Sequence, residues 1–320
     1  MPMQAFLYTE TKATELPFAE AAAHFGKADL VWLHLDGQTA EARDWIDGQV
    51  TIPSIVRNAL RASETRPRSD ILDGGSIINL RGLGEKPEEA ADPLVSIRFW
   101  AEKGRVISLS YRPLAGLNDV IEWFLGGQIK DPGDLITAFA TEMSKGLDPK
   151  VAALGDVLDS VEARIEDNNA RSTRRKVSKI RAQAIGYRRF VAPQREALER
   201  LAAARCSWLD EEDQSHLREA SDRYARMAEE LEAVRERAAV VHDELTDLRT
   251  ERMDARALLI SIVALIFLPL TFITGLLGMN VKGIPYAEET WAFWGVVALC
   301  ALLGIAVLAY FIRLRWVRGR

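Results

Sequence analysis

Small and polar side chains recur every three or four residues along a long, uncharged segment near the C-terminus. Counted backwards from Gly275, the series comprises Thr271, Leu268, Ala264, Ile260 and Ala257, and it continues as Met253, Thr250, Thr246 and Asp243. This spacing places all of them on one face of a helix. Small side chains let helices approach closely, whereas hydroxyl and carboxylate oxygens attract cations or their water. The stripe therefore fits two interpretations, close helix packing alone or a narrow ion path between several helices.

A neutral amide ends the same segment. The chain reads Gly278-Met279-Asn280, and the asparagine amide offers both hydrogen-bond donors and acceptors. Repeated around a symmetry axis, this amide would bind the water shell of an arriving cation. The arrangement suits a strongly hydrated divalent ion, because removing water from such an ion is costly. Pro269, within the segment, is expected to remove one backbone hydrogen bond and to kink the helix.

Two uncharged runs, 257–281 and 291–312, predict two transmembrane helices joined by a short loop, 281–290. At about 1.5 Å per residue, each run is long enough to cross a hydrocarbon layer of about 30 Å. The alternative is a buried helical hairpin in a soluble core, for which two such runs are too long and too apolar. A single hairpin cannot enclose a water-filled path, so conduction of ions would require several subunits.

Basic residues precede the first run and follow the second. They are Arg249, Arg252 and Arg256 before the first run, and Arg313, Arg315, Arg318 and Arg320 after the second. The loop carries Lys282 against Glu288 and Glu289. By the positive-inside rule, we expect both termini in the cytoplasm and the loop outside. The N-terminal residues do not read as a signal peptide, so we expect a protein of the inner (cytoplasmic) membrane, in contact with membrane lipid.

The remainder of the chain predicts an α+β architecture. Residues 1–145 are expected to form a mixed α/β cytoplasmic domain, with strands at 30–35, 76–80, 94–100 and 105–110 and helices at 114–125 and 134–145. Residues 146–256 are expected to form a long-helix stalk, and residues 257–317 the transmembrane hairpin. From about Asp213 to the first run there is neither proline nor glycine, which predicts one helix of roughly 60 residues, or about 90 Å. Pro193 is expected to interrupt an earlier helix, and 208–213 to link two helical arms.

Composition argues against several other classes of protein. The formal net charge of −5 gives no reason to expect binding to nucleic acid. We find no Gly-rich phosphate loop, no GxSxG motif and no catalytic cluster, so we expect neither an enzyme nor a bound cofactor. Cys206 and Cys300 are far apart and suggest no disulfide framework. The four scattered histidines are interpreted as ordinary surface or core residues.

The segment from Phe267 to Asn280, FLPLTFITGLLGMN, resembles the first membrane helix of the CorA superfamily of divalent-cation transporters. The Gly-Met-Asn signature closes a proline-containing span, after a very long helix and before a terminal hairpin, as in that family. Residues 188–196, with Arg188, Arg189 and Pro193, also resemble its stalk pattern. The resemblance covers residues 150–320 well and the N-terminal domain only in layout. It implies a homopentameric funnel whose first membrane helices line the pore.

By position, the resemblance also implies a role for each residue of the stripe. Gly278, Met279 and Asn280 would form the outer cation entrance, and Thr271 a polar station in the pore. The other pore-lining positions would be Gly275, Leu268, Ala264, Ile260 and Ala257, with Asp243 facing the pore in the stalk. Leu268 and Ala257 depart from the methionines of some magnesium-transporting members.

The loop after Asn280 bears on the transported ion. Gly283-Ile284-Pro285 resembles the ZntB-like branch, which is associated with zinc, although Lys282 replaces a glycine usual there. We therefore expect Zn²⁺ as the transported ion, with proton coupling and the direction of transport left open. The stripe has no Cys or His, the usual zinc ligands, so zinc would pass largely hydrated. His242 beside Asp243 is the one stalk pair to test as a transient ligand.

Two alternatives remain. The first is a magnesium or broad divalent-cation channel, which would differ chiefly in the loop after Asn280. The second is a membrane-anchored coiled-coil scaffold that transports nothing and tolerates the loss of Asn280, but it leaves the polar stripe unexplained. Acidic residues such as Glu211, Glu212 and Asp213 are interpreted as helix surface rather than as a regulatory metal site.

Overall fold

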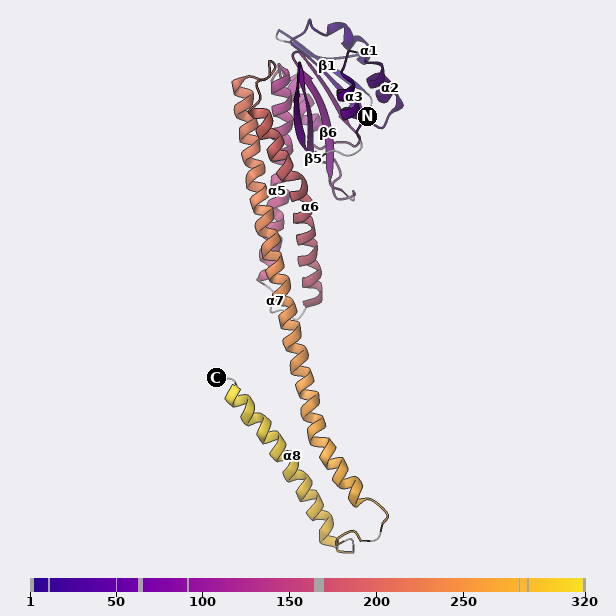
Figure 1. Ribbon diagram of the computed structural model, residues 1–320, viewed down its shortest axis with the longest axis vertical. Helices are drawn as coiled ribbons and strands as arrows, with labels where there is room; N and C mark the ends of the chain where they lie inside the picture. The colour runs from indigo at the N-terminus through magenta and orange to yellow at the C-terminus, as the bar shows by residue number, and fades with distance from the viewer. Residues whose placement is uncertain are drawn as a thin grey trace. The chain divides into compact units, whose positions relative to one another are not determined.

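The computed structural model describes residues 3–10, 12–49, 51–62, 66–90, 92–163, 170–281, 283–286 and 288–318. The chain divides into two compact units, Met1–His242 and Asp243–Arg320. Figure 1 traces the elements of both units in chain order. The first unit contains the sheet and most of the helices, and the second contains the apolar C-terminal segments.

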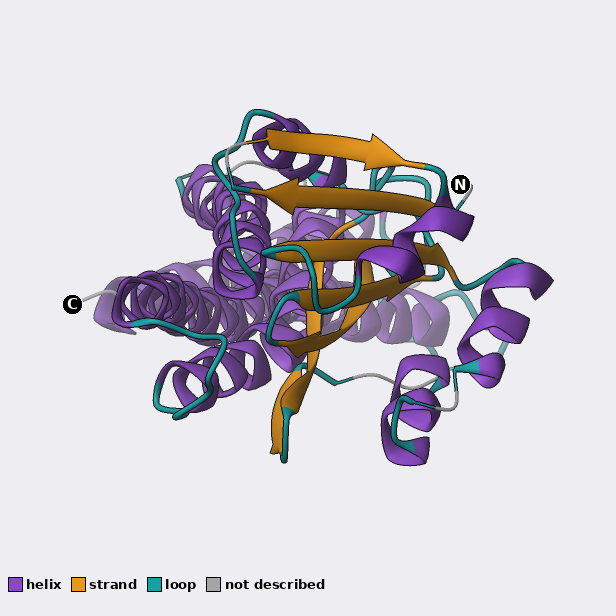
Figure 2. Cartoon of the chain, turned by 90° about the horizontal axis from the view of Figure 1, so that it is seen from above, coloured by secondary structure: helices purple, strands orange, loops and turns teal. Residues whose placement is uncertain are grey.

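A seven-stranded mixed sheet forms the centre of the first unit (Figure 2). Its strands are β1 (Gln4–Thr9), β2 (Lys12–Leu16), β3 (Leu30–Asp36), β4 (Arg68–Leu72), β5 (Gly75–Leu83), β6 (Leu94–Glu102) and β7 (Arg105–Ser110). Their order is β2-β1-β3-β7-β6-β5-β4. The central β3–β7 pair is parallel, and the other pairs are antiparallel. The four strands expected from sequence are confirmed as β3, β5, β6 and β7, whereas β1, β2 and β4 were not predicted.

Short helices cover one face of this sheet. They are α1 (Phe18–Ala21), α2 (Ala40–Gly48) and α3 (Ser54–Arg61), with the 3₁₀ turn η1 (Ala22–His24) after α1. Ile46 of α2 and Val56 of α3 pack against Val31 and Leu33 of β3, all almost fully buried. Because β3 is buried on both faces, its sequence is a continuous apolar run rather than an alternating one.

Aromatic side chains fill the opposite face, beneath α4 (Leu117–Leu125) and α5 (Pro132–Glu162). The rings of Phe6 and Trp32 are stacked with centroids 4.7 Å apart, and Phe124 of α4 lies 5.7 Å from both. Phe139 of α5 lies 5.0 Å from Phe99 and 5.7 Å from Trp32. These rings fix α4 and α5 on the sheet, because aromatic pairs at such distances add to the burial of their area.

The helix α6 (Ala170–Ala202) continues through Pro193, so the expected interruption there is wrong. Contacts made by Gln194, the residue after the proline, hold α6 in place. Gln194 accepts a hydrogen bond from the backbone N–H of Arg81 at 2.7 Å, donates to its carbonyl at 3.0 Å, and donates to the hydroxyl of Tyr224 at 2.6 Å. Tertiary contacts therefore compensate for the one backbone bond that proline removes. In the same way α5 runs on through Pro149, across the expected domain limit at residue 145.

The expected long helix is present as α7 (Glu211–Leu277), which has 67 residues. The second apolar run lies in α8 (Thr290–Arg318). In the first unit, the early part of α7 is tied to α5 and α6. Arg237 bonds to Asp159 and Glu162 of α5, each at 2.5 Å, and Glu232 lies 3.0 Å from Arg188 of α6.

Candidate ion path and metal sites

The apolar parts of α7 and α8 are both long enough to cross a membrane. Each contains an 18-residue window with a mean hydropathy of 2.6, and none of either window is buried inside the chain. An apolar surface of this extent needs a covering of lipid or of other protein. The two helices expected from the uncharged runs are therefore present, and the chain itself buries no residue of either window.

One row of side chains on α7 is partly covered, and it faces α8. The row consists of Ile262, Ile266, Leu270, Ile273 and Leu277. At its middle, a Cβ atom added to Gly304 of α8 would lie 4.0 Å from Cγ2 of Ile266. The small residue at position 304 therefore lets the two helices approach, as small residues do between membrane helices.

The six expected pore-lining residues lie on the other side of α7. All six are exposed, with Leu268 at 77% and Ile260 at 67%. At about 100° per residue, the stripe is centred roughly 160° from the row that faces α8. The stripe that the spacing predicted is therefore one continuous face, turned away from the hairpin partner.

Threonine hydroxyls on this helix bond to their own backbone. The hydroxyl of Thr271 donates to the carbonyl of Phe267 at 2.7 Å, and that of Thr274 donates to the carbonyl of Leu270 at 2.9 Å. Each hydroxyl has one hydrogen to donate and two lone pairs to accept with. The Thr271 oxygen therefore keeps accepting capacity on the exposed stripe, where it suits the water around a cation.

The end of α7 presents the expected entrance residues. The N–H of Gly278 donates to the carbonyl of Thr274 at 2.9 Å, and a Cβ at Gly278 would lie only 3.1 Å from that oxygen. Asn280 is exposed, and its amide has no hydrogen-bond partner among the described residues. Gly283 has a φ of +106°, a conformation that strongly favours glycine. Lys282, which the sequence placed in this entrance, lies outside the described residues.

The stalk pair His242 and Asp243 is less favourable as a metal ligand. Asp243 is exposed, as expected for a residue facing a path. His242 Nε2, however, lies 3.3 Å from Nη2 of Arg174 on α6. A guanidinium at this distance opposes the binding of a cation to the imidazole.

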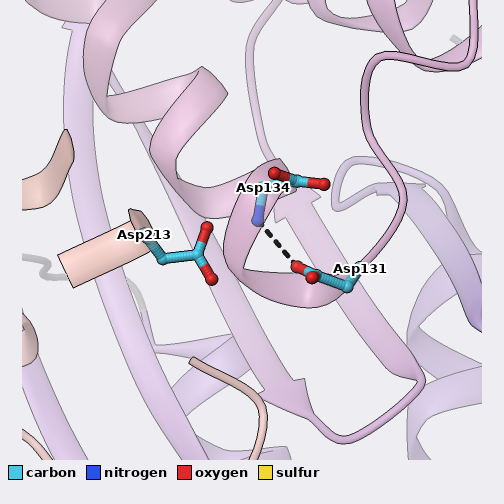
Figure 3. A group of neighbouring side chains, drawn as sticks. All are labelled: Asp131, Asp134 and Asp213. Carbon is cyan, nitrogen blue, oxygen red and sulfur yellow. Dashed lines mark hydrogen bonds between the residues drawn. The ribbon is translucent and has the colours of Figure 1, made fainter. Parts of the chain in front are cut away.

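A cluster of three carboxylates in the first unit was not predicted (Figure 3). Oxygens of Asp131, Asp134 and Asp213 lie within 4.8 Å of one another. Asp131 caps the start of α5 by accepting from the N–H of Asp134 at 2.9 Å, and Asp213 approaches from the first turn of α7. A Cβ at Gly133 would lie 1.9 Å from Oδ2 of Asp213, so only glycine permits this approach. Asp213 is 3% exposed, which corrects its interpretation as helix surface.

The surroundings of Asp213 disfavour its charge. Burial raises its pKa to about 7, and the neighbouring carboxylates of Asp131, Asp210 and Asp134 add to that rise. A hydrogen bond from the N–H of Asp210, at 3.1 Å, acts in the opposite direction. Asp210 in turn accepts from the N–H of Asp213 at 2.8 Å. Helix capping accounts for these carboxylates, and the signal in the sequence is an Asp-x-x-Asp pattern at the start of both α5 and α7.

The α+β unit and the two uncovered spans define an integral membrane protein. Residues 27–313 match the family model described as CorA-like Mg²⁺ transporter protein. The chain is 34% identical over 293 residues to the divalent cation transporter CmaX of Pseudomonas aeruginosa, covering 89% of this chain and 87% of CmaX. It is 30% identical over 293 residues to the zinc transport protein ZntB of Yersinia pseudotuberculosis, covering 89% of this chain and 87% of ZntB. The structure of full-length CmaX matches with a TM-score of 0.83 at 31% identity, over 99% of this chain and 98% of that one.

The chain belongs to the CorA family of divalent-cation transporters. The resemblance to that superfamily and its ZntB-like branch is therefore confirmed, together with the α+β fold and the integral membrane character. Transport of divalent metal ions is the activity of this family.

Proposed function

We propose that this protein carries Zn²⁺ across the inner membrane, through a path lined by the stripe on α7 in a homopentamer. The observation that carries the proposal is the position of the stripe. Its six residues are exposed on the face of α7 opposite α8, and the exposed Asn280 follows three residues after the helix ends at Leu277. A single chain leaves this face uncovered, so copies of the same helix are its natural neighbours.

In this proposal the ion enters with most of its water. Asn280 and the backbone at Gly278 and Met279 bind the hydration shell at the outer entrance, because an amide offers both donors and acceptors. Thr271 then accepts from the same water, and Leu268, Ile260 and Ala257 form the narrow apolar part. Asp243 attracts the ion in the stalk. The two termini lie in the cytoplasm, in accord with the arginines that flank the spans.

The choice of zinc rests on the relative named as a zinc transport protein and on Gly283-Ile284-Pro285. A magnesium or broad divalent-cation channel is the second candidate, favoured by the description of the family model and by CmaX. The two candidates are separated by which ion the protein carries and by whether an inward proton gradient stimulates that transport.

The test is ion flux into liposomes that contain the purified protein, with Zn²⁺ and Mg²⁺ compared in the presence and absence of a pH gradient. We expect zinc entry that inward protons stimulate and that Asn280→Ala lowers at least tenfold. Magnesium entry that ignores pH would favour the channel, and no flux of either ion would favour a scaffold.

A matched pair of variants tests the stripe itself. Thr271→Val should lower zinc flux several-fold, whereas Thr274→Val should not, since Thr274 bonds in the same way but lies off the stripe. Equal effects of the two substitutions would contradict this assignment of the pore face.

A further inference from the structure

A basic cavity of about 780 Å³ lies in the first unit, between strands β5 and β6, the segment after β7, and α6. We call it the arginine cavity, because six arginines line it. They are Arg61, Arg66, Arg81, Arg98, Arg112 and Arg189. Among the described residues of the lining, Asp92 is the one acidic residue. The cavity belongs to the first unit and the stripe to the second, and the cavity is independent of the function proposed above.

Few carboxylates balance this charge. Asp92 pairs with Arg81 at 2.5 Å, and Arg61 pairs with Asp47 at 2.6 Å. Within the described part of the chain, the other four arginines of the cavity have no carboxylate at ion-pair distance. Like charges gathered in one concave site create a strong positive potential, which attracts anions of high charge.

Arg98 lines this cavity and has buried donors that other described residues leave unused. Its side chain is 3% exposed, and its Nη2 donates to the carbonyl of Ala62 at 2.7 Å. Its Nε and Nη1 are also buried, and neither has a hydrogen-bond partner among the residues that the structure describes. A buried guanidinium with two unused donors is costly unless an acceptor meets them.

Other contacts hold the arginines in place before any ligand arrives. The guanidinium of Arg81 lies 3.8 Å from the ring centre of Phe190, and that of Arg98 lies 4.8 Å from the ring centre of Tyr111. Arg112 donates to the backbone carbonyls of Asp92, at 3.0 Å, and of Leu94. Side chains already fixed in this way lose little freedom on binding, which favours affinity.

We propose that the arginine cavity binds a multivalent phosphate anion, either inorganic or carried by a small organic molecule. The planar guanidinium fork matches two phosphate oxygens at once, and several forks converge here. The volume of the cavity lies in the range of small-molecule sites. A monovalent ion would leave most of the charge unbalanced.

The test is calorimetric titration of the full-length protein in a neutral detergent, at constant ionic strength in chloride. Pyrophosphate and ATP should bind with one site per chain, at least tenfold more tightly than inorganic phosphate. Tighter binding of ATP than of pyrophosphate would identify the organic form as the preferred one, and the reverse would identify the inorganic form. Either result supports the proposal.

Variants locate the site. Arg98→Gln should weaken pyrophosphate binding by ten- to a hundredfold, and circular dichroism would report any loss of fold. Arg66→Gln and Arg189→Gln, at exposed positions, should each weaken it about three- to tenfold without a change in fold. The matched control is Arg181→Gln, an exposed arginine two turns away on α6, which should leave the affinity unchanged.

Two outcomes would overturn the proposal. One is the absence of saturable binding of any phosphate at millimolar concentration. If Arg189→Gln then also changes the oligomeric size, carboxylates of a second copy occupy the cavity in place of a phosphate. The other is an equal loss of affinity in Arg181→Gln and Arg189→Gln, which would show only general charge attraction.

Discussion

Gln194 in the first unit and Thr271 in the second are both polar side chains within long helices, but they use their hydrogen bonds differently. Gln194 is buried and joins α6 to the backbone of Arg81 and to Tyr224. Thr271 is exposed and bonds only to the carbonyl one turn before it in its own helix. The first unit thus fixes its helices by contacts between elements, whereas the spans of the second satisfy their backbone locally.

The difference follows from the solvent that each unit meets. A unit surrounded by water buries its apolar side chains within itself, and it must then pair the polar groups that it buries. Helices in lipid satisfy their backbone internally and leave apolar surface for lipid or for other helices. The structure of the first unit is therefore specified within one chain, and that of the second is completed by its surroundings.

Replacing one phenylalanine of each unit by alanine should give the largest difference in stability between the two units. Phe139 is 1% exposed among aromatic rings, whereas Phe267 on α7 is 62% exposed. Phe139→Ala should destabilise the first unit by about 3–5 kcal/mol, because it leaves a cavity in the core. Phe267→Ala should change the stability by less than about 1 kcal/mol. Thermal unfolding in detergent, followed by near-ultraviolet circular dichroism, measures both, and equal shifts would contradict the comparison.

Substitutions at Gln194 and Thr271 should differ less in their effect on stability. Gln194→Leu leaves the N–H of Arg81 without its acceptor and should reduce the stability by about 2–3 kcal/mol. Thr271→Val removes a bond that its helix does not require, and a loss below about 0.5 kcal/mol is expected. Denaturant unfolding of the purified variants gives both values. A large loss in Thr271→Val would indicate that its hydroxyl bonds to a neighbouring helix in the assembled protein.

A substitution at Asp213 should change the stability by the smallest amount of the three comparisons, and the change should depend on pH. Its pKa is about 7 in the folded protein, whereas an ordinary aspartate has a pKa of 3.8, so the folded state binds more protons than the unfolded state between those values. Stability should therefore fall as the pH rises from about 4 through 7. Asp213→Asn resembles the protonated form and keeps an oxygen for the N–H of Asp210. It should raise the stability by roughly 1–2 kcal/mol at pH 8 and by less than half as much at pH 5.

Melting temperatures of the wild type and Asp213→Asn at the two pH values measure this difference. A gain that is the same at pH 5 and pH 8 would show that the carboxyl does not titrate in this range. Titration with Mg²⁺ at pH 8 adds a control, because a cation held by the cluster would stabilise the wild type more than the variant.

Some features of the molecule could be predicted because they depend on local pattern. The strands β3, β5, β6 and β7 are apolar runs of the right length, and the spans and the stripe follow from hydrophobicity and helical spacing. The edge strands β2 and β4 contain exposed polar residues, so their pattern is weak. The continuation of α6 through Pro193 depends on contacts made by Gln194 with a distant strand. The arginine cavity unites residues from 61 to 189, and no spacing rule connects them.

The order of the strands has a consequence for synthesis of the chain. β7 is the last strand to emerge from the ribosome, yet it lies between β3 and β6 at the centre of the sheet. Until it is made, the nascent chain has two antiparallel groups, β2-β1-β3 and β6-β5-β4, each with an open edge. Open edges of this kind pair readily with other chains. A ribosome that stalls before residue 105 would therefore release a product prone to aggregate, whereas a few further residues join both groups into one sheet.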